Sequence, residues 1–129
     1  MSDTIWKPIP GYEKEYKVSN DGRVMALERY TTFKRGTTVV RKRLPQKELT
    51  PSKTKEGYRI AELWKGGKRE RIYLHILVLR AFHGQGAPNM VGTHIDGDLD
   101  NNHADNLAWS VLHHPVHYMN YGAYANPAQ

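Results

Sequence analysis

Residues 93–109 read THIDGDLDNNHADNLAW, and this stretch predicts the local structure of the last third of the chain. We expect a strand over 92–96, an Asp-Gly turn, a loop of Asn and Asp residues, and a second strand over 106–109. Ser110 then fits the N-cap of a last helix. The predicted order is strand, turn, strand, helix.

The same stretch carries titratable groups. All seven histidines of the chain lie between His75 and His117, and four aspartates follow His94 within the quoted stretch. No Lys or Arg occurs after Arg80. Because histidine near neutral pH transfers protons and binds metals, we expect a chemical site here.

Three further segments show regular patterns. Residues 16–19 and 23–27 alternate apolar and polar side chains around an Asp-Gly pair, which predicts a hairpin. Residues 58–64 and 68–74 flank a Gly-Gly pair and predict a second hairpin. Residues 75–82 are almost entirely apolar and predict one short buried helix.

Two segments lack that regularity. Residues 6–12 contain two prolines and a glycine, so we expect them to be extended or turning rather than helical. Residues 30–48 are polar, basic and rich in Thr. They are interpreted as a mobile loop that becomes ordered on a partner.

Charge is distributed unevenly along the chain. The formal net charge is +6, but residues 29–71 contain fourteen Lys and Arg and only four acids. A basic surface attracts polyphosphates because binding releases counterions, so this region indicates a nucleic-acid partner. A solvated basic face without a partner is the alternative.

Composition limits the class of protein. With 129 residues and no cysteine, the chain is one domain or two small modules, without disulfides or thiolate metal sites. The first residues lack the features of a signal peptide, and no apolar run reaches the roughly 18 residues of a membrane span. We expect a soluble, cytoplasmic protein without a membrane partner.

Three stretches together resemble one group of nucleases. The residues THIDGD (93–98), NN (101–102) and NLAW (106–109) resemble the HNH motif of phage and intron-encoded homing endonucleases. Residues 6–24 resemble the NUMOD4 module that precedes HNH domains in those enzymes, and residues 74–82 resemble the short helix ahead of the HNH core. The resemblance implies an α+β fold with a small β-hairpin N-terminal module and a C-terminal ββα-metal nuclease core, the His-Me finger.

The resemblance also implies an organisation and a reaction. A NUMOD4-like module with the basic loop would occupy residues 1–50, and an HNH nuclease domain would occupy 51–129, with its ββα-metal core at about 88–121. The enzyme would hydrolyse phosphodiester bonds of DNA, by nicking or by double-strand cleavage. A phage origin would place it in the cytoplasm of an infected bacterium.

Two residues take catalytic roles by this resemblance. His94 resembles the general base that activates water, and Asn106 resembles the central Asn that fixes the loop and orients the base. In the alternative, His94 is a hydrogen-bonding loop residue and Asn106 a local turn or cap residue. His75 matches the helix ahead of the core, where we expect it to hold the ββα unit by hydrogen bonding.

The expected metal ligands depart from the family pattern. Thr93, a weak neutral ligand, stands where the family carries Asp, Asn or His. An ungapped alignment places Pro115 at the second ligand position, whereas a one-residue deletion places His114 there and His117 three residues later. We prefer the gapped alignment because it supplies an imidazole; His113, which would share a helical face with His117, is the competitor.

The implied cofactor is one divalent metal cation. Mg²⁺ or Mn²⁺ is expected first, and Ni²⁺ or Zn²⁺ is the alternative that an imidazole-rich site favours. Asp96 or Asp98 replaces the missing acidic ligand in one alternative. In another, the domain has lost catalysis and keeps DNA binding.

The basic residues predict the DNA contacts. Two runs are dense, one in the 30–48 segment and one around the tip of the second hairpin, where a ribbon can follow phosphates. Trp64 and Tyr73 are expected in the core. The predicted DNA-binding residues are Arg41, Lys42, Arg43, Lys65, Lys68, Arg69 and Arg71.

The sequence thus predicts a metal-dependent DNA endonuclease with His94 as its base. A DNA-binding accessory or regulatory protein with a degenerate HNH site is the first alternative, and a module that binds a protein partner is the second. Because little chain follows the core, we expect a short or loosely read target, or a protein partner that supplies specificity. The sequence does not predict an oligomeric state.

Overall fold

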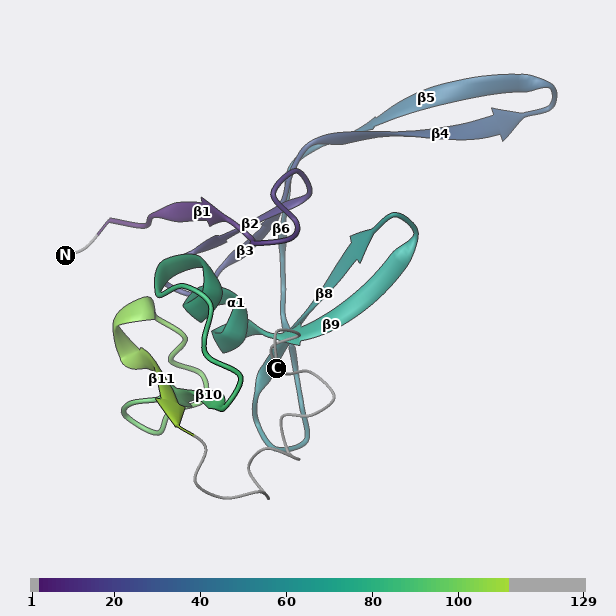
Figure 1. Cartoon of the computed structure of the whole chain (residues 1–129). Coiled ribbons are helices and arrows are strands. Elements are labelled where there is room, and N and C mark those ends of the chain that lie inside the picture. The colour runs from purple at the N-terminus through teal and green to yellow at the C-terminus, as the bar shows by residue number, and fades with distance from the viewer. Residues whose placement is uncertain (1–2, 112–129) are drawn as a thin grey trace.

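The computed structural model describes residues 3–111, and the structural statements below concern that part of the chain. Its elements follow in chain order (Figure 1). They are β1 (Trp6–Pro8), β2 (Tyr16–Ser19), β3 (Val24–Ala26), β4 (Arg29–Arg35), β5 (Thr38–Leu44), β6 (Lys47–Leu49), β7 (Ser52–Lys53), β8 (Arg59–Lys65), β9 (Lys68–Tyr73), α1 (Leu74–Phe82), β10 (Met90–His94), the 3-10 helix η1 (Ala104–Asn106) and β11 (Leu107–Val111).

The N-terminal sheet has the strand order β1-β2-β3-β6, with antiparallel neighbours. The predicted first hairpin is confirmed as β2 and β3, and the opening segment is extended, as expected. Val18 and Val24 face each other across this hairpin and are fully buried. The Ser19 hydroxyl accepts a 2.8 Å hydrogen bond from the Arg23 amide, which closes the turn.

The interpretation of residues 30–48 as a loop is wrong. Most of the segment forms an antiparallel hairpin in which Arg29 pairs with Leu44 and Arg35 with Thr38. Thr, Val, Tyr and Phe favour strands, and Gly36 supplies the positive φ of 64° that the turn requires. This hairpin, here called the arm, extends away from the rest of the molecule (Figure 1), and every side chain of β4 is exposed.

The second predicted hairpin is confirmed as β8 and β9, which β7 extends to three strands. Its inner half is buried and its outer half is exposed. Tyr73 lies in the core as expected, with 4% exposure. The placement of Trp64 in the core is wrong: its side chain is 50% exposed, because it lies near the hairpin tip where no layer covers the strand.

The predicted buried helix is confirmed as α1, which connects the whole molecule. It contacts strands of the N-terminal sheet, the β8–β9 hairpin and the C-terminal strands. The segment 76–79 of α1 is fully buried, and one apolar cluster runs from Ile9 to Leu107. At Gly92 a Cβ atom would lie 2.8 Å from His75 and 2.9 Å from both Ile76 and Leu79, so β10 packs directly on α1.

The C-terminal strands β10 and β11 pair antiparallel, with Met90 opposite Val111 and His94 opposite Leu107. The prediction that Ser110 caps a helix is therefore wrong. Ser110 pairs with Val91 inside β11, because the alternation of residues 107–111 continues the strand. The helix expected after Ser110 lies outside the described residues. Within residues 3–111, no helix has the length and apolar character needed to cross a membrane.

Candidate active site

His94 is the last residue of β10 and is nearly buried, with 7% exposure. Its Nε2 lies 2.8 Å from Oδ1 of Asn102. Its ring centroid lies 4.7 Å from that of His75 and 6.3 Å from that of Tyr58. Two sides of the imidazole are thus fixed, one by a hydrogen bond and one by packing against rings.

His75, on α1, packs directly against the ring of His94. It is 1% exposed, and its ring packs against Tyr58 at 5.6 Å and Tyr73 at 5.4 Å. Burial, and next the neighbouring His94, lower the pKa of His75 to about 3. His75 therefore stays neutral at ordinary pH and packs beside His94.

The loop after His94 is held by Asn106. The Asn106 side chain accepts a 3.1 Å hydrogen bond from the Asp96 amide and donates 2.9 Å hydrogen bonds to Asp96 Oδ1 and to the Asn101 carbonyl. Its backbone carbonyl accepts a 2.7 Å bond from the Ile95 amide. Asn106 thus holds this loop, and the orientation of the base that the resemblance implied for it stays a prediction.

Asp96 is engaged by the same loop. Hydrogen bonds from Asn101, from the Asp98 amide and from Asn106 hold the pKa of the Asp96 carboxyl below its usual value. Asp98 in turn accepts a 3.0 Å bond from the Asp100 amide. These aspartates form turns of the loop rather than a cluster aimed at His94.

The side chain that bonds the His94 ring is Asn102, which the sequence reasoning did not single out. Asn102 belongs to the Asn pair that carried the resemblance, and that pair was the available signal. Its side-chain Nδ2 donates a 3.2 Å hydrogen bond to the Leu99 carbonyl. Asn102 is 5% exposed, so both ends of its amide are used inside the protein.

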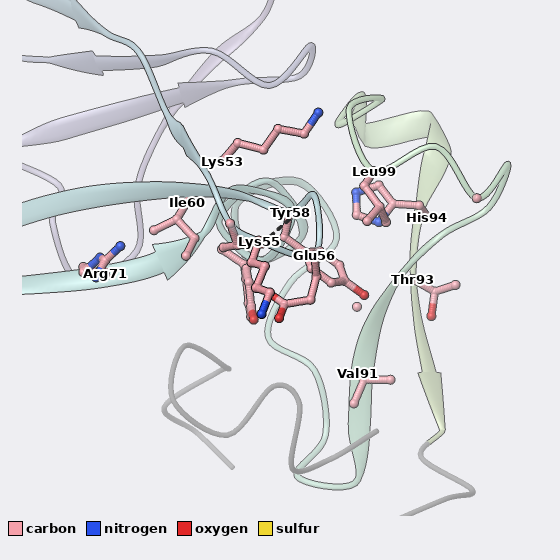
Figure 2. Close-up of a pocket in the computed structure, with 14 residues that line it drawn as sticks. Lys53, Lys55, Glu56, Tyr58, Ile60, Arg71, Val91, Thr93, His94 and Leu99 are labelled. Atoms are coloured by element: carbon pink, nitrogen blue, oxygen red, sulfur yellow. Dashed lines mark hydrogen bonds between the residues drawn. The ribbon is translucent and has the colours of Figure 1, made fainter. Parts of the chain in front are cut away.

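His94 opens onto a pocket of about 1000 Å³ between the β7–β8–β9 sheet and β10. Figure 2 shows Lys53, Lys55, Glu56 and Arg71 on one side of it and His94 and Leu99 on the other. Arg71 is one of the predicted DNA-binding residues, whereas the sequence analysis did not single out Lys53 and Lys55. They lie about 40 residues before His94, and only the fold brings them to the same pocket.

Two ion pairs join the loop after His94 to the strands β7 and β8 beside this pocket. Asp100 binds Arg59 at 3.0 Å and Lys53 at 3.4 Å. Hydrogen bonds from Arg59 and then Lys53 keep the pKa of the Asp100 carboxyl below its usual value. The loop that carries Asn102 is therefore tied to the strands that carry the pocket cations.

The other predicted DNA-binding residues lie at two separate places. The first group is on β5 of the arm, where Arg41 stacks 4.0 Å over the Tyr30 ring and Arg43 pairs with Glu28 at 3.0 Å. The second is near the β8–β9 tip, where the exposed Trp64 faces Arg69. The remaining members of the two groups are Lys42, Lys65 and Lys68.

The described residues alone do not fit a divalent metal. The Thr93 hydroxyl donates to the Ser110 hydroxyl at 2.9 Å, and Thr93 alternates with His94, so the two side chains leave opposite faces of β10. Among residues 3–111, no group of three or more His, Asp or Glu side chains is arranged to hold a metal ion. The other predicted ligands, His114 and His117, and their competitors His113 and Pro115 lie outside the described residues.

Two family models match this chain in the order of its elements. Residues 5–64 match the NUMOD4 motif, and residues 72–110 match the HNH endonuclease family. The second match contains α1, β10, the loop fixed by Asn106, and β11. The chain therefore belongs to the proteins that carry a NUMOD4 motif followed by an HNH endonuclease domain, which confirms the expected fold class.

A particular relative can be named. The chain is 36% identical over 104 residues to the DNA endonuclease I-HmuI of Bacillus phage SP01, an alignment that includes 81% of this chain and 51% of that protein. A solved structure of DNA binding and cleavage by the HNH homing endonuclease I-HmuI matches with a TM-score of 0.67 and 32% identity, over 92% of this chain and 60% of that one. The chain is a homologue of I-HmuI and spans about half the length of this curated relative.

Proposed function

We propose that this protein is a DNA endonuclease that hydrolyses phosphodiester bonds with His94 as the general base. The single observation that carries the proposal is His94 itself. It stands at the end of β10 inside an HNH match, held by Asn102 and opening onto a pocket lined by cations. I-HmuI is named as a DNA endonuclease and supports the same activity.

The chemical step follows from these groups. His94 takes a proton from water, the water oxygen bonds to phosphorus, and one P–O bond of the DNA backbone breaks. The electron pair of that bond leaves on the sugar oxygen, which takes a proton from solvent. Lys53, Lys55 and Arg71 in the pocket hold the negatively charged phosphate, and Asn106 keeps the loop beside His94 in place.

In this proposal the arm and the β8–β9 hairpin bind the DNA outside the pocket. In this proposal Arg41, Lys42 and Arg43 of the arm and Lys65, Lys68 and Arg69 near the β8–β9 tip contact phosphates, which position the protein without reading bases. A two-stranded ribbon fits the major groove of DNA, about 12 Å wide. The I-HmuI structure, which is described as one of DNA binding, supports a DNA partner.

Several parts of the proposal remain predictions. HNH nucleases typically depend on a metal, and Mg²⁺ or Mn²⁺, or alternatively Ni²⁺ or Zn²⁺, is predicted here. His114 and His117, which lie outside the described residues, are predicted to be metal ligands. The division into modules 1–50 and 51–129, and a protein partner that supplies specificity, also stay predictions.

A plasmid assay tests the activity. Purified protein incubated with supercoiled plasmid and Mg²⁺, Mn²⁺ or Ni²⁺ should produce nicked or linear DNA, separated on a gel. His94→Ala should lower the rate by at least about 100-fold, because a general base contributes about that much or more. Asp105→Ala, an exposed change elsewhere in the loop, serves as the control and should cut normally.

One observation favours a second candidate. Thr93 occupies the position where the family carries a stronger metal ligand, and its hydroxyl donates to Ser110. This difference fits a DNA-binding accessory protein with a degenerate site. That protein would bind DNA in a salt-dependent manner and leave plasmid uncut under every metal. Cleavage that disappears with His94→Ala excludes it.

A further inference from the structure

The amide of Asn102 can have only one orientation. Its nitrogen faces the Leu99 carbonyl at 3.2 Å, and a carbonyl oxygen only accepts hydrogen bonds. The other end, Oδ1, therefore points at Nε2 of His94, at 2.8 Å. Because Oδ1 is itself an acceptor, Nε2 must carry the hydrogen when the imidazole is neutral.

This orientation decides which ring nitrogen is free to act. A neutral imidazole with its hydrogen on Nε2 has its lone pair on Nδ1. The bond to Asn102 occupies Nε2, which leaves the Nδ1 lone pair as the one that accepts a proton. Asn102 thus selects the atom that accepts a proton.

Asn102 is itself backed by the turn between β2 and β3. An added Cβ at Gly22 would lie 3.0 Å from the Asn102 Cβ and 3.2 Å from the Asn102 carbonyl oxygen. The neighbouring Asn20 accepts a 2.7 Å hydrogen bond at its carbonyl from the Ala104 amide. The turn between β2 and β3 therefore contacts the loop at Asn102 and at Ala104.

The turn between β2 and β3 is itself held by hydrogen bonds and burial. The Asn20 side chain accepts a 2.8 Å bond from the Ile5 amide and donates a 3.2 Å bond to the Asp3 carbonyl, which ties the turn to the residues just before β1. Ser19 is fully buried and Asn20 is 8% exposed. Gly22 has a φ of 86°, a conformation that favours glycine.

We propose that Asn102 is the positioning residue of the active site, which fixes the His94 ring with its proton on Nε2, and that the turn Asn20–Gly22 of the NUMOD4 motif holds Asn102 in place. The inference rests on the proposed role of His94 as the base. It gives the N-terminal module a function at the catalytic centre in addition to any DNA contact.

Nitrogen-15 NMR of the full chain tests the first half of the inference. In long-range proton–nitrogen spectra of neutral imidazole, the nitrogen that carries hydrogen is distinguished from the one that does not. The His94 signals, assigned by their loss in His94→Gln, should show hydrogen on Nε2. Asn102→Ala should give a mixture of the two tautomers, and Asn102→Asp, which keeps an acceptor, should restore the Nε2 form.

Kinetics adds the second readout for the same variants. Asn102→Ala should lower kcat by about 10- to 100-fold, the usual cost of removing a supporting hydrogen bond in an active site. The KM for plasmid should change by less than about threefold, because no DNA contact is lost. Asn102→Asp should recover most of kcat. A His94 spectrum and a kcat unchanged by Asn102→Ala would overturn the role of Asn102.

Two glycines give a matched test of the turn. Gly11 and Gly22 both have a φ of 86°, so alanine strains the backbone equally at both, but a Cβ at Gly11 meets nothing within 4 Å. Gly22→Ala must displace Asn102 by a few tenths of an ångström and should shift the His94 nitrogen signals and lower kcat about tenfold. Gly11→Ala should lower the melting temperature similarly and leave both readouts unchanged.

The outcomes separate the two proposals. Equal kcat values and identical His94 spectra for Gly11→Ala and Gly22→Ala would overturn the supporting role of the turn. If Gly22→Ala fails to fold, Asn20→Asp takes its place, because it loses the bond to the Asp3 carbonyl and loosens the turn without adding a Cβ. If the unmodified protein cuts no DNA, the proposed function fails, while the spectra still decide whether Asn102 and the turn fix His94.

Discussion

His75 couples the stability of the site to pH. Its pKa is about 3 in the folded chain against an ordinary value of 6.5, so between these values the unfolded chain binds one more proton. Stability therefore falls as pH falls through this window. From about pH 7 to about pH 5 the free energy of unfolding should drop by about 2 kcal/mol through His75. Urea unfolding at the two pH values measures it.

A variant isolates that contribution. His75→Phe keeps a ring among Tyr58, Tyr73 and His94 but cannot titrate. The free energy of unfolding of this variant should differ from that of the unmodified protein by an amount that does not depend on His75 titration. Its decrease from about pH 7 to about pH 5 should be about 2 kcal/mol smaller than that of the unmodified protein. An equal loss in both proteins would show that His75 is protonated normally in the folded state.

Contacts were predictable where one short motif contains both partners. The side-chain hydrogen bonds of Asn106 are with residues at most ten positions away, so a fixed loop after His94 follows from the spacing within 93–109, whereas the catalytic roles of His94 and Asn106 stay predictions. Lys53 and Lys55 were not predictable, because they reach the pocket only when β7 and β10 are brought together. Asn102 was visible in the Asn pair, but its contact with His94 depends on how the loop folds back.

At the scale of elements, the arm shows how charge and strand pairing combine. Directly opposite residues of a hairpin share a face, so Tyr30 and Arg43 lie on one face and Thr31 and Lys42 on the other. Cations therefore occupy both faces, and neither face packs on a core. A ribbon that is basic on both faces can meet phosphates on two sides.

Salt dependence tests whether the arm contacts DNA phosphates. Changing Arg41, Lys42 and Arg43 together to Ser should reduce the slope of log affinity against log salt by about 2.7, at about 0.9 for each lost phosphate contact on duplex DNA. Fluorescence anisotropy with a labelled duplex at several salt concentrations measures the slope. Folding should be unaffected, because these three side chains are exposed.

A second triple variant separates the effect of net charge from the effect of direct phosphate contacts. The change of Lys7, Lys14 and Lys17 to Ser removes the same charge from the N-terminal part of the chain and should reduce the slope by much less. Equal slopes for the two triple variants would mean that the arm makes no specific phosphate contacts.

The elements themselves were largely predictable, and the errors have physical causes. Both Gly-containing hairpins and α1 follow from alternation, turn residues and a buried apolar run. The polarity of residues 30–48 predicts a loop, but Thr, Val, Tyr and Phe favour strands when a glycine turn joins two equal halves, and the arm forms instead. Trp64 is exposed, contrary to expectation, because alternation predicts which face of a strand a side chain occupies. It does not predict whether another layer of the protein covers that face.

At the scale of the whole molecule, the two family matches share one core. Val18 and Val24 of the NUMOD4 part belong to the same apolar cluster as Leu77 of α1 and Leu107 of β11. The turn at Gly22 packs on Asn102, and the Asn20 carbonyl binds the Ala104 amide. Sequence patterns located the two modules but did not show that both pack on helix α1.

This shared core predicts that the chain unfolds as one cooperative unit. Fragments 1–50 and 51–129 each lose many of the partners of buried side chains such as Val18 and Leu77, so neither should show the near-ultraviolet circular dichroism of fixed tertiary packing. The full chain should give coincident near- and far-ultraviolet transitions in urea. Replacement of residues 30–43 of the arm by a short turn is the matched control, because these residues lie outside the core, and its transition midpoint should stay close to that of the full chain. A fragment 51–129 that unfolds cooperatively by itself would show instead that the HNH part is stable without the NUMOD4 motif, and the support of Asn102 by Gly22 would then be dispensable for folding.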